Sequence, residues 1–241
     1  MQNSLYVGLS GQRALMRRLE TIADNVSNMS TVGFRASGVS FAAEVARTGD
    51  SRTAFASPGA DYVSRRAGAL LRTDNELDVA IQGDGWLGVA TAGGTAYTRD
   101  GRMRISESGT LETVNGLKVL DAGGAAIILD PHGARPVITE DGMINQGGRQ
   151  LGAIGLFSID DDAKLTRTTN SAVFSDRPAK PVLDFTKNRI AQGWVEQSNV
   201  SPVQEMTKLI SISRTFDSLA SGMSQMDSAV QDAIKTLGGQ A

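Results

Sequence analysis

Apolar residues recur at intervals of three and four positions at both ends of the chain. The pattern is clearest near the C-terminus, where it consists of Leu209, Ile212, Phe216, Leu219, Met223, Met226, Val230, Ala233 and Leu237. Such spacing is typical of the a and d positions of a coiled coil, and it continues here over four heptads. The sequence therefore predicts a long helix that begins near Ser201 and Pro202 and ends at the glycines of 238–239.

The N-terminal segment has the same spacing with one polar member. Its stripe consists of Leu5, Leu9, Gln12, Met16, Leu19, Ala23 and Val26, and Leu15 and Ile22 widen it. The charged residues fall mainly on other faces, so a second long amphipathic helix is expected. This helical pattern runs into the polar stretch NVSNMSTVGFRAS at 25–37, where a cluster of Asn, Ser and Thr precedes a glycine, an aromatic residue and a cation.

Between the two ends the period changes. From about residue 70 to 190, short apolar runs alternate with turn signals such as GDG, AGG, ESG, VNG and EDG, and most of the 27 glycines lie here. This pattern predicts many short strands joined by tight turns. The run ISESGTL at 105–111 recurs as ITEDGMI at 138–144, which indicates two similar hairpins.

These patterns predict an α+β fold in which long N- and C-terminal helices pair as a coiled-coil-like domain. A mainly antiparallel β domain is inserted between them in the sequence. The expected segments are an N-terminal helix over 1–35, an extended linker over 36–70, a β-rich outer domain over 71–192 and a C-terminal helix over 193–241. Neither stripe can be buried by a domain at the far end of its helix. We therefore expect the helices to pack on each other and on those of neighbouring subunits.

The composition limits the chemistry. The chain has no cysteine, which excludes disulfides and thiolate metal sites, and its one histidine, His132, lies in the turn-like run DPHGARP. A formal net charge of -2 gives no reason to expect a nucleic-acid partner. No apolar run is long enough to span a bilayer, and the N-terminus lacks the apolar region and cleavage site of a signal peptide. We therefore expect no cofactor, no metal, no membrane insertion and no cleaved signal peptide.

Two groups of acidic residues resemble functional patterns only in part. Glu76 and Asp78 would have to form a carboxylate pair to hydrolyse a glycoside, but acids two residues apart beside a strand are common. The three aspartates at 160–162 lack the later ligands of a calcium loop. We expect a protein that is not an enzyme. A cell-wall-cutting enzyme and a coiled-coil chaperone or adaptor are the alternatives from other classes.

Three motifs lie in the same order along nearly the whole chain. The first combines an Asn-rich turn with Thr-x-Gly-Phe-Lys/Arg and is matched by Asn25, Asn28, Thr31, Gly33, Phe34 and Arg35. The second is TDNELDVAIQGDGW at 73–86, and the third is QSNVSPVQEMTKLISISRTFDS at 197–218, whose helical end matches more loosely. Together they resemble the signatures of bacterial flagellar axial proteins, the rod and hook group.

The resemblance implies a structural subunit of the flagellar basal-body rod, which crosses the periplasm. Such a subunit is exported unfolded by the flagellar type III apparatus and assembles through its terminal helices into the axial drive shaft that transmits torque. The expected partners are copies of itself, the proximal-rod and distal-rod subunits, and the export apparatus. The short length and the start NSLYVGLSGQ are most similar to a proximal-rod member, with a distal-rod member as the alternative.

The expected assembly interface combines the helical stripes with the polar turn. In the turn, Asn and Ser side chains would bond the exposed groups of the helix end, Gly33 would permit a left-handed turn, and Phe34 would anchor the chain against a neighbour. The expected residues are Leu5, Leu9, Met16, Leu19, Asn25, Val26, Asn28, Gly33, Phe34, Leu209, Ile212, Phe216, Leu219, Met223, Met226 and Val230.

Overall fold

A computed structural model describes residues 2–48, 51–168 and 171–239 of the chain. Within this part, the side chains at 2–5, 41–48, 51–58 and at positions 226, 227, 230, 234 and 237 lie outside the description. The chain divides into two compact units. Residues 1–27, 37–61 and 201–241 make up the helical unit, and residues 28–36 and 62–200 make up the β unit.

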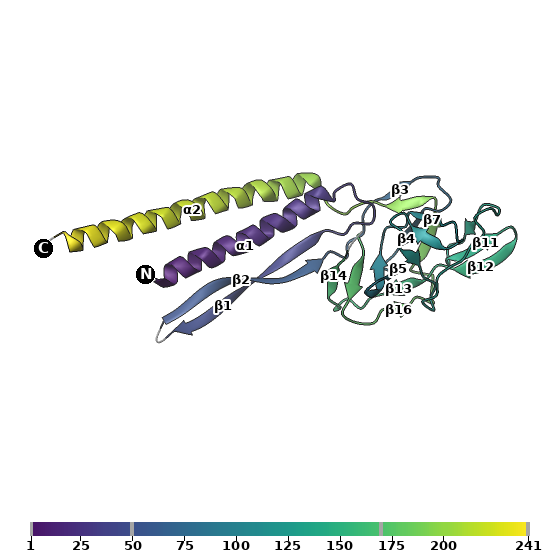
Figure 1. The fold of residues 1–241 in the computed structure, drawn as a ribbon, viewed down its shortest axis with the longest axis horizontal. Helices are drawn as coiled ribbons and strands as arrows, with labels where there is room; N and C mark the ends of the chain where they lie inside the picture. The colour runs from purple at the N-terminus through teal and green to yellow at the C-terminus, as the bar shows by residue number, and fades with distance from the viewer. Residues whose placement is uncertain (1, 49–50, 169–170, 240–241) are drawn as a thin grey trace. The chain divides into compact units, whose positions relative to one another are not determined.

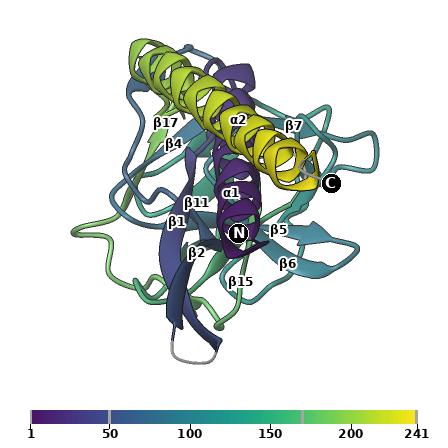
Figure 2. The same cartoon turned by 90° about the vertical axis from the view of Figure 1, so that its left-hand side faces the viewer.

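Two long helices dominate the helical unit, as the apolar spacing predicts. Helix α1 spans Gln2–Ser27 and helix α2 spans Pro202–Gly238, and they lie side by side (Figure 1 and Figure 2). A Cβ added to Gly8 would lie 3.1 Å from Sδ of Met223, and one added to Gly11 would lie 3.4 Å from a methyl carbon of Leu219. Glycine at position 8 therefore lets the helices approach closely, whereas a Cβ at Gly11 would make an ordinary van der Waals contact.

The two ends of α2 lie where the sequence predicts them. Ser201 precedes the helix with an extended backbone, although its side chain makes no capping hydrogen bond, and Pro202 occupies the first turn. At the other end, the backbone N–H of Gly239 donates to the carbonyl of Lys235. Neither helix, over its described residues, is long and apolar enough to cross a membrane.

The segment expected to be an extended linker holds two strands. Strand β1 spans Ser37–Thr48, strand β2 spans Ser51–Val63, and the two pair in a two-stranded sheet whose first strand packs along α1. The Ser40 hydroxyl donates to the carbonyl of Ala60, 3.0 Å away. An extended backbone has unpaired N–H and C=O groups along its length, and pairing the two halves of the segment satisfies them.

The β unit contains the remaining strands, and all their described pairings are antiparallel, as expected. Over the described residues they form one nine-stranded sheet, one three-stranded sheet and two two-stranded sheets. The nine-stranded sheet consists of β5 (Trp86–Thr91), β6 (Gly94–Thr98), β7 (Met103–Ile105), β8 (Leu111–Thr113), β9 (Lys118–Val119), β13 (Leu156–Ser158), β14 (Leu165–Arg167), β15 (Val173–Ser175) and β16 (Lys180–Pro181). The smaller sheets are β10 (Val137–Ile138) with β11 (Met143–Gln146) and β12 (Arg149–Ala153), β4 (Val79–Gln82) with β17 (Arg189–Gln192), and β3 (Leu70–Arg72) with β18 (Trp194–Glu196).

The repeated sequence pattern corresponds to two hairpins, which confirms that prediction. In the hairpin of β7 and β8, Ile105 lies opposite Leu111, and in that of β10 and β11, Ile138 lies opposite Ile144. The glycines of the two turns have nearly the same backbone conformation, with φ values of 81° and 83°. A side chain would strain the backbone at such a φ, so glycine recurs at the same place in both turns.

The main core of the β unit is aliphatic. Because the strands are short, it gathers one or two side chains from many of them around a common centre. Its fully buried members are Val79, Ile81, Leu87, Met103, Leu111, Val119, Ile127, Leu129, Ile138, Ile144, Ile154, Leu156, Val182 and Ile190. A second cluster contains Trp86, Tyr97 and Phe157.

Candidate functional site

The acidic residues and the histidine singled out in the sequence have ordinary contacts. Glu76 accepts a hydrogen bond from Arg135, and the buried Asp78 accepts one from the amide of Asn75. His132 is exposed, and its backbone N–H donates to Asp130. The described residues contain no group of three or more His, Asp or Glu side chains that could hold a metal ion. The candidate site lies among buried polar groups.

The polar stretch after α1 forms a turn that leads into the β unit. We call residues 28–36 the entry segment. Its first residues form a turn in which the N–H of Thr31 donates to the carbonyl of Asn28, and the N–H of Phe34 donates to that of Thr31. The short polar side chains thus belong to a tight turn that ends the helix.

Gly33 is required where the entry segment meets the β unit. Its φ is 69°, and a Cβ at this position would lie 2.2 Å from the backbone nitrogen of Asp100, so only glycine fits. Its N–H donates to the carbonyl of Glu196 at 2.7 Å. Phe34 follows, 2% exposed, with the guanidinium carbon of Arg167 4.1 Å from the centre of its ring. The aromatic residue of the motif is therefore covered by its own chain.

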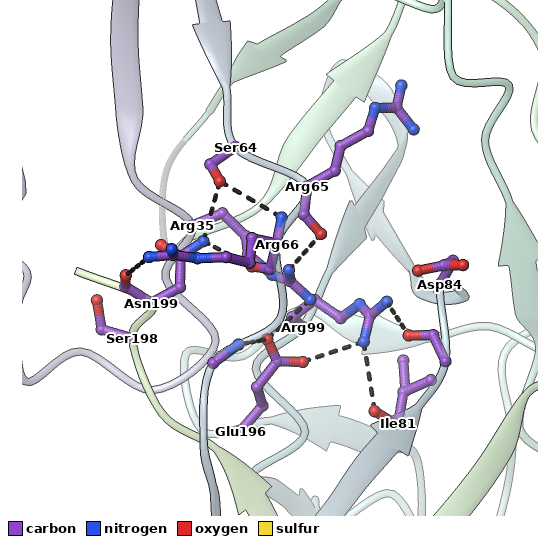
Figure 3. A network of polar contacts seen from close by, with 12 residues as sticks. Arg35, Ser64, Arg65, Arg66, Ile81, Asp84, Arg99, Glu196, Ser198 and Asn199 are labelled. Atoms are coloured by element: carbon purple, nitrogen blue, oxygen red, sulfur yellow. Dashed lines mark hydrogen bonds and ion pairs between the residues drawn. The ribbon is translucent and has the colours of Figure 1, made fainter. Parts of the chain in front are cut away.

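A buried carboxylate joins the entry segment to the core of the β unit. Oε1 of Glu196 lies 2.8 Å from Nη2 of Arg35, and Oε2 lies 3.0 Å from Nη1 of Arg99 (Figure 3). Each of the three side chains is at most 2% exposed. The backbone N–H of Gly68 also donates to Oε1. Two guanidinium groups thus share one carboxylate away from water.

Trp86 lies against both cations. The guanidinium carbons of Arg35 and Arg99 are 5.7 and 5.4 Å from the centre of its ring. Burial, followed by repulsion from Arg35, lowers the pKa of Arg99 to about 10, and burial also lowers the pKa of Arg35. The charge of Asp84 acts to raise the pKa of both arginines. The positive charge of the two arginines is therefore offset by Asp84 as well as by Glu196.

Asn199 ties together the segments by which the chain enters and leaves the β unit. We call residues 197–200, which follow β18, the exit segment. The side chain of Asn199 accepts a hydrogen bond from the N–H of Ala36 at 2.7 Å. It also donates to the carbonyl of Arg66 at 2.6 Å (Figure 3). Its backbone N–H donates to the carbonyl of Phe34. One asparagine thus binds the entry segment through both its side chain and its backbone.

A second buried polar group lies within the helical unit. The Asn25 side chain at the end of α1 both donates to the carbonyl of Ser37 and accepts from its N–H, at 2.9 and 2.8 Å. Its amide also lies 3.3 Å from Oε2 of Glu205 in α2, and Lys208 donates to the other oxygen of that carboxylate. Asn25 and Glu205 are 3% and 5% exposed. Asn25 therefore links α1, β1 and α2.

Replacing Asn25 by aspartate is expected to destabilise the helical unit by about 2–4 kcal/mol. The change removes the amide donor and places a second carboxylate beside Glu205, and each buried partner left without a hydrogen bond costs about 1–3 kcal/mol. Thermal unfolding followed by the helical circular dichroism signal measures this loss. The exposed turn residue Asn115 is the control, and Asn115→Asp should leave the helical transition unchanged. An equal, small effect of both changes would contradict the bridging role of Asn25.

The stripe expected on α2 is also its covered face in the single chain. Ile212 is buried, and Leu209, Phe216, Leu219 and Met223 are half-buried. The stripe expected on α1 is only partly covered in the single chain. Leu19 and Val26 are half-buried, whereas Leu9 and Met16 remain 47% and 59% exposed. Leu5, Met226 and Val230 lie outside the described side chains.

The expected interface residues near the turn are covered by this chain. Asn25, Gly33 and Phe34 are buried, and Asn28 is half-buried. Phe34 was expected to face a neighbouring subunit, and its ring instead meets Arg167 of the same chain. The contacts of these residues are thus internal, and a role for them in assembly stays a prediction.

The sequence analysis missed Glu196, Arg99 and Arg167 and gave Asn199 no individual role. Asn199 lies in the third motif and Trp86 closes the second, so both are part of the quoted runs. Arg99 lies in the run TRDGR, which reads as an ordinary charged turn. A charge run is usually a solvated face, and nothing in its spacing distinguishes an arginine that points into the core.

Family models and curated relatives agree with the resemblance noted in the sequence. Residues 5–35 match the model described as "Flagella basal body rod protein". Residues 80–146 match "Flagellar hook protein FlgE/F/G D1 domain", and residues 191–236 match "Flagellar basal body rod FlgEFG protein C-terminal". The first and third matches include most of the entry segment and nearly all of α2, and the second covers the first half of the large sheet.

The curated relatives extend along the whole chain. The flagellar basal-body rod protein FlgF of Mesorhizobium japonicum is 48% identical over 100% of both chains, and that of Rhizobium meliloti is 43% identical over 99% of both. FlgG of Bacillus subtilis is 28% identical over 97% of this chain and 98% of its own. Because FlgF relatives align from end to end with higher identity than this FlgG, the chain belongs to the family of flagellar basal-body rod proteins, in its FlgF group.

Proposed function

We propose that this protein is a proximal-rod subunit that assembles through α1 and α2 into the axial shaft that transmits torque, and that it performs no catalysis. One observation supports this most strongly. Both helices keep large apolar side chains exposed after they have packed on each other: Tyr6, Leu9 and Met16 on α1, and Val203, Met206 and Ile210 on α2 are each 47–74% exposed. Such stripes favour burial against further helices.

The two helices of one subunit would pair as a coiled-coil-like domain. Support comes from the a/d spacing on α2, from the covered state of Ile212 and Phe216, and from the close approach at Gly8. The exposed stripes described above would then contact neighbours. A subunit with a heterologous interface of this kind adds copies along an axis, which is how a tubular shaft grows.

The proposed partners are copies of this chain, the other proximal-rod and distal-rod subunits, and the flagellar type III export apparatus. Export by that route is what the resemblance of the three motifs to flagellar axial proteins implies. The proposed location is the basal-body rod where it spans the periplasm. Fractionation tests this directly: a tagged chain should copurify with basal bodies, whereas a chaperone would stay in the cytoplasm and overturn the proposal.

A cell-wall-cutting enzyme is the rival function, and it needs a pair of carboxylates around a cleft. Glu76 and Asp78 are engaged by Arg135 and Asn75, and the FlgF relatives are named as rod proteins. Both observations favour a structural role. Degradation of purified cell-wall sacculi by the purified chain, lost in Glu76→Gln, would show the enzyme instead.

Limited proteolysis of the free subunit is expected to trim roughly residues 1–60 and 200–241 and to leave the β unit intact. The physical reason is that the exposed stripes on α1 and α2 gain most of their burial from neighbours, so in the monomer these helices open at lower cost than the β unit does. Mass spectrometry of the protected core gives its boundaries. Rapid cleavage inside 75–190 with protected ends would contradict the expectation.

A further inference from the structure

The entry segment is bound to the β unit without being part of any of its sheets. None of its residues lies in a strand. Its backbone bonds to the rest of the unit run from Gly33 to Glu196, from Asn199 to Phe34 and from Ser64 to Ala36. The remaining contacts are made by side chains, chiefly those of Phe34, Arg35 and Asn199. A segment held in this way can detach without breaking a sheet ladder.

The two arginines that share Glu196 are anchored differently. Arg99 also donates to the carbonyls of Ile81 and Gly83, so it is fixed to β4 and the turn that follows. Arg35 is carried by the entry segment and also donates to the carbonyl of Arg65 at 2.6 Å. Nε of both arginines finds no acceptor among the described residues. If the entry segment leaves, Arg99 and Glu196 remain as a pair of one cation and one anion. When it is bound, two buried cations repel each other across one carboxylate.

We propose that the entry segment is a strap that opens and closes on a folded β unit, and that Arg99 keeps Glu196 paired while the strap is open. In the closed state the strap fills a slot between the exit segment and residues 64–68. Phe34 is then buried, and the Asn199 side chain bonds both Ala36 of the strap and Arg66. In the open state the slot between the exit segment and residues 64–68 is vacant, and the sheets of the β unit are unchanged. Opening releases residues 28–36 as a loop whose two ends stay together, because Asn25 remains bonded to Ser37.

Native-state hydrogen exchange of the full chain, resolved by residue with NMR, tests the strap. The reporter amides are Gly33 and Ala36, which donate to Glu196 and Asn199. The reference amides are Leu111 and Leu120 in the body, which donate to Ile127 and Gly88. If the strap opens by itself, its amides should exchange about 100-fold faster than the reference amides or more, because local opening needs less free energy than unfolding.

Two substitutions should move this ratio in opposite directions. Arg35→Gln removes the cation that the strap brings, so the strap amides should lose nearly all protection while Leu111 and Leu120 stay protected. Arg99→Gln leaves Arg35 as the only cation paired with Glu196, so opening would leave a buried carboxylate without a counter-charge. The strap should then open only with the body, and the ratio of exchange rates should fall towards one.

The exposed Arg104, which pairs with Glu112 on the strand surface, provides the matched control. Arg104→Gln should leave the ratio as in the unchanged chain. Equal exchange of strap and reference amides in the unchanged chain would show that the cluster is part of one cooperative core and would overturn the proposal. So would a ratio that moves in the same direction in Arg35→Gln and Arg99→Gln. If Arg99→Gln does not fold, the unchanged chain and Arg35→Gln still decide the matter.

Discussion

Replacing Phe216 by aspartate is expected to abolish swimming while leaving the β unit folded. Phe216 is the largest residue of the α2 stripe and is half-buried in the single chain. Burying such a side chain is worth about 1.5–3 kcal/mol, and an unpaired carboxylate in its place adds a desolvation cost of several kcal/mol. The loss recurs in every subunit, so assembly should fail before the fold does. Swimming in soft agar and electron microscopy of basal bodies measure the effect.

The neighbouring Asp217 provides the control for this experiment. It is exposed and lies off the stripe, so Asp217→Asn should swim and form complete rods. Thermal unfolding of the purified Phe216→Asp chain should show the transition of the β unit unchanged. Normal motility of the Phe216→Asp strain would mean that α2 is not packed as proposed.

Replacing Glu196 by alanine is expected to lower the free energy of unfolding of the β unit by about 3–5 kcal/mol, the usual cost of removing one partner of a buried ion pair. The change leaves Arg35 and Arg99 buried without their carboxylate, and it also removes the acceptor of the Gly68 N–H. Urea unfolding followed by tryptophan fluorescence measures the loss, because Trp86 lies against both arginines. This loss is a large fraction of the roughly 5–15 kcal/mol by which an ordinary domain is stable.

Glu140 is the matched control for Glu196. It also pairs with an arginine, Arg189, at 3.2 Å, but its side chain is 74% exposed. Exposed ion pairs contribute about 0–1 kcal/mol, so Glu140→Ala should hardly change the unfolding curve. Similar losses in the two variants would show that the buried cluster contributes no more to stability than a surface pair.

The helices and hairpins could be predicted because their signals are local. The a/d spacing of α2 and the glycine after each strand lie within a few residues of the structure they specify. Gly109 and Gly142 show this best, since both adopt a φ that disfavours a side chain and both close a hairpin. The same local logic located the start of α2 at Pro202.

The buried cluster could not be predicted, because its members are far apart in the sequence. Arg35, Arg99 and Glu196 come together only through the fold, and each taken alone is an ordinary charged residue. The entry segment illustrates the same limit. Its motif indicated a helix end and a left-handed glycine, and both are present. The anchoring of Phe34 against a neighbouring subunit stays a prediction. Which surface Phe34 meets is decided by the position of Arg167, more than 130 residues later.

The sequence pattern also could not show which face of α1 packs on α2. Its apolar residues cover a wide arc, so several stripes can be drawn through them. Of the described apolar side chains of α1, Ala14 and Ile22 are buried, whereas Leu9 and Met16 are exposed. The close approach at Gly8 supplies the reason, since a glycine lets the partner helix pack nearest to its own side. Apolar periodicity shows that a stripe exists but not which part of it the first partner covers.

A density map of an intact basal body, with side chains traced, tests the central claim most directly. The claim is that this chain is a rod subunit held in the shaft by α1 and α2. The expected map places both helices in the inner layer, with Leu9, Met16, Val203 and Ile210 buried against helices of neighbouring subunits. A map in which these side chains face solvent, and in which neighbouring subunits touch only through their β units, would contradict it.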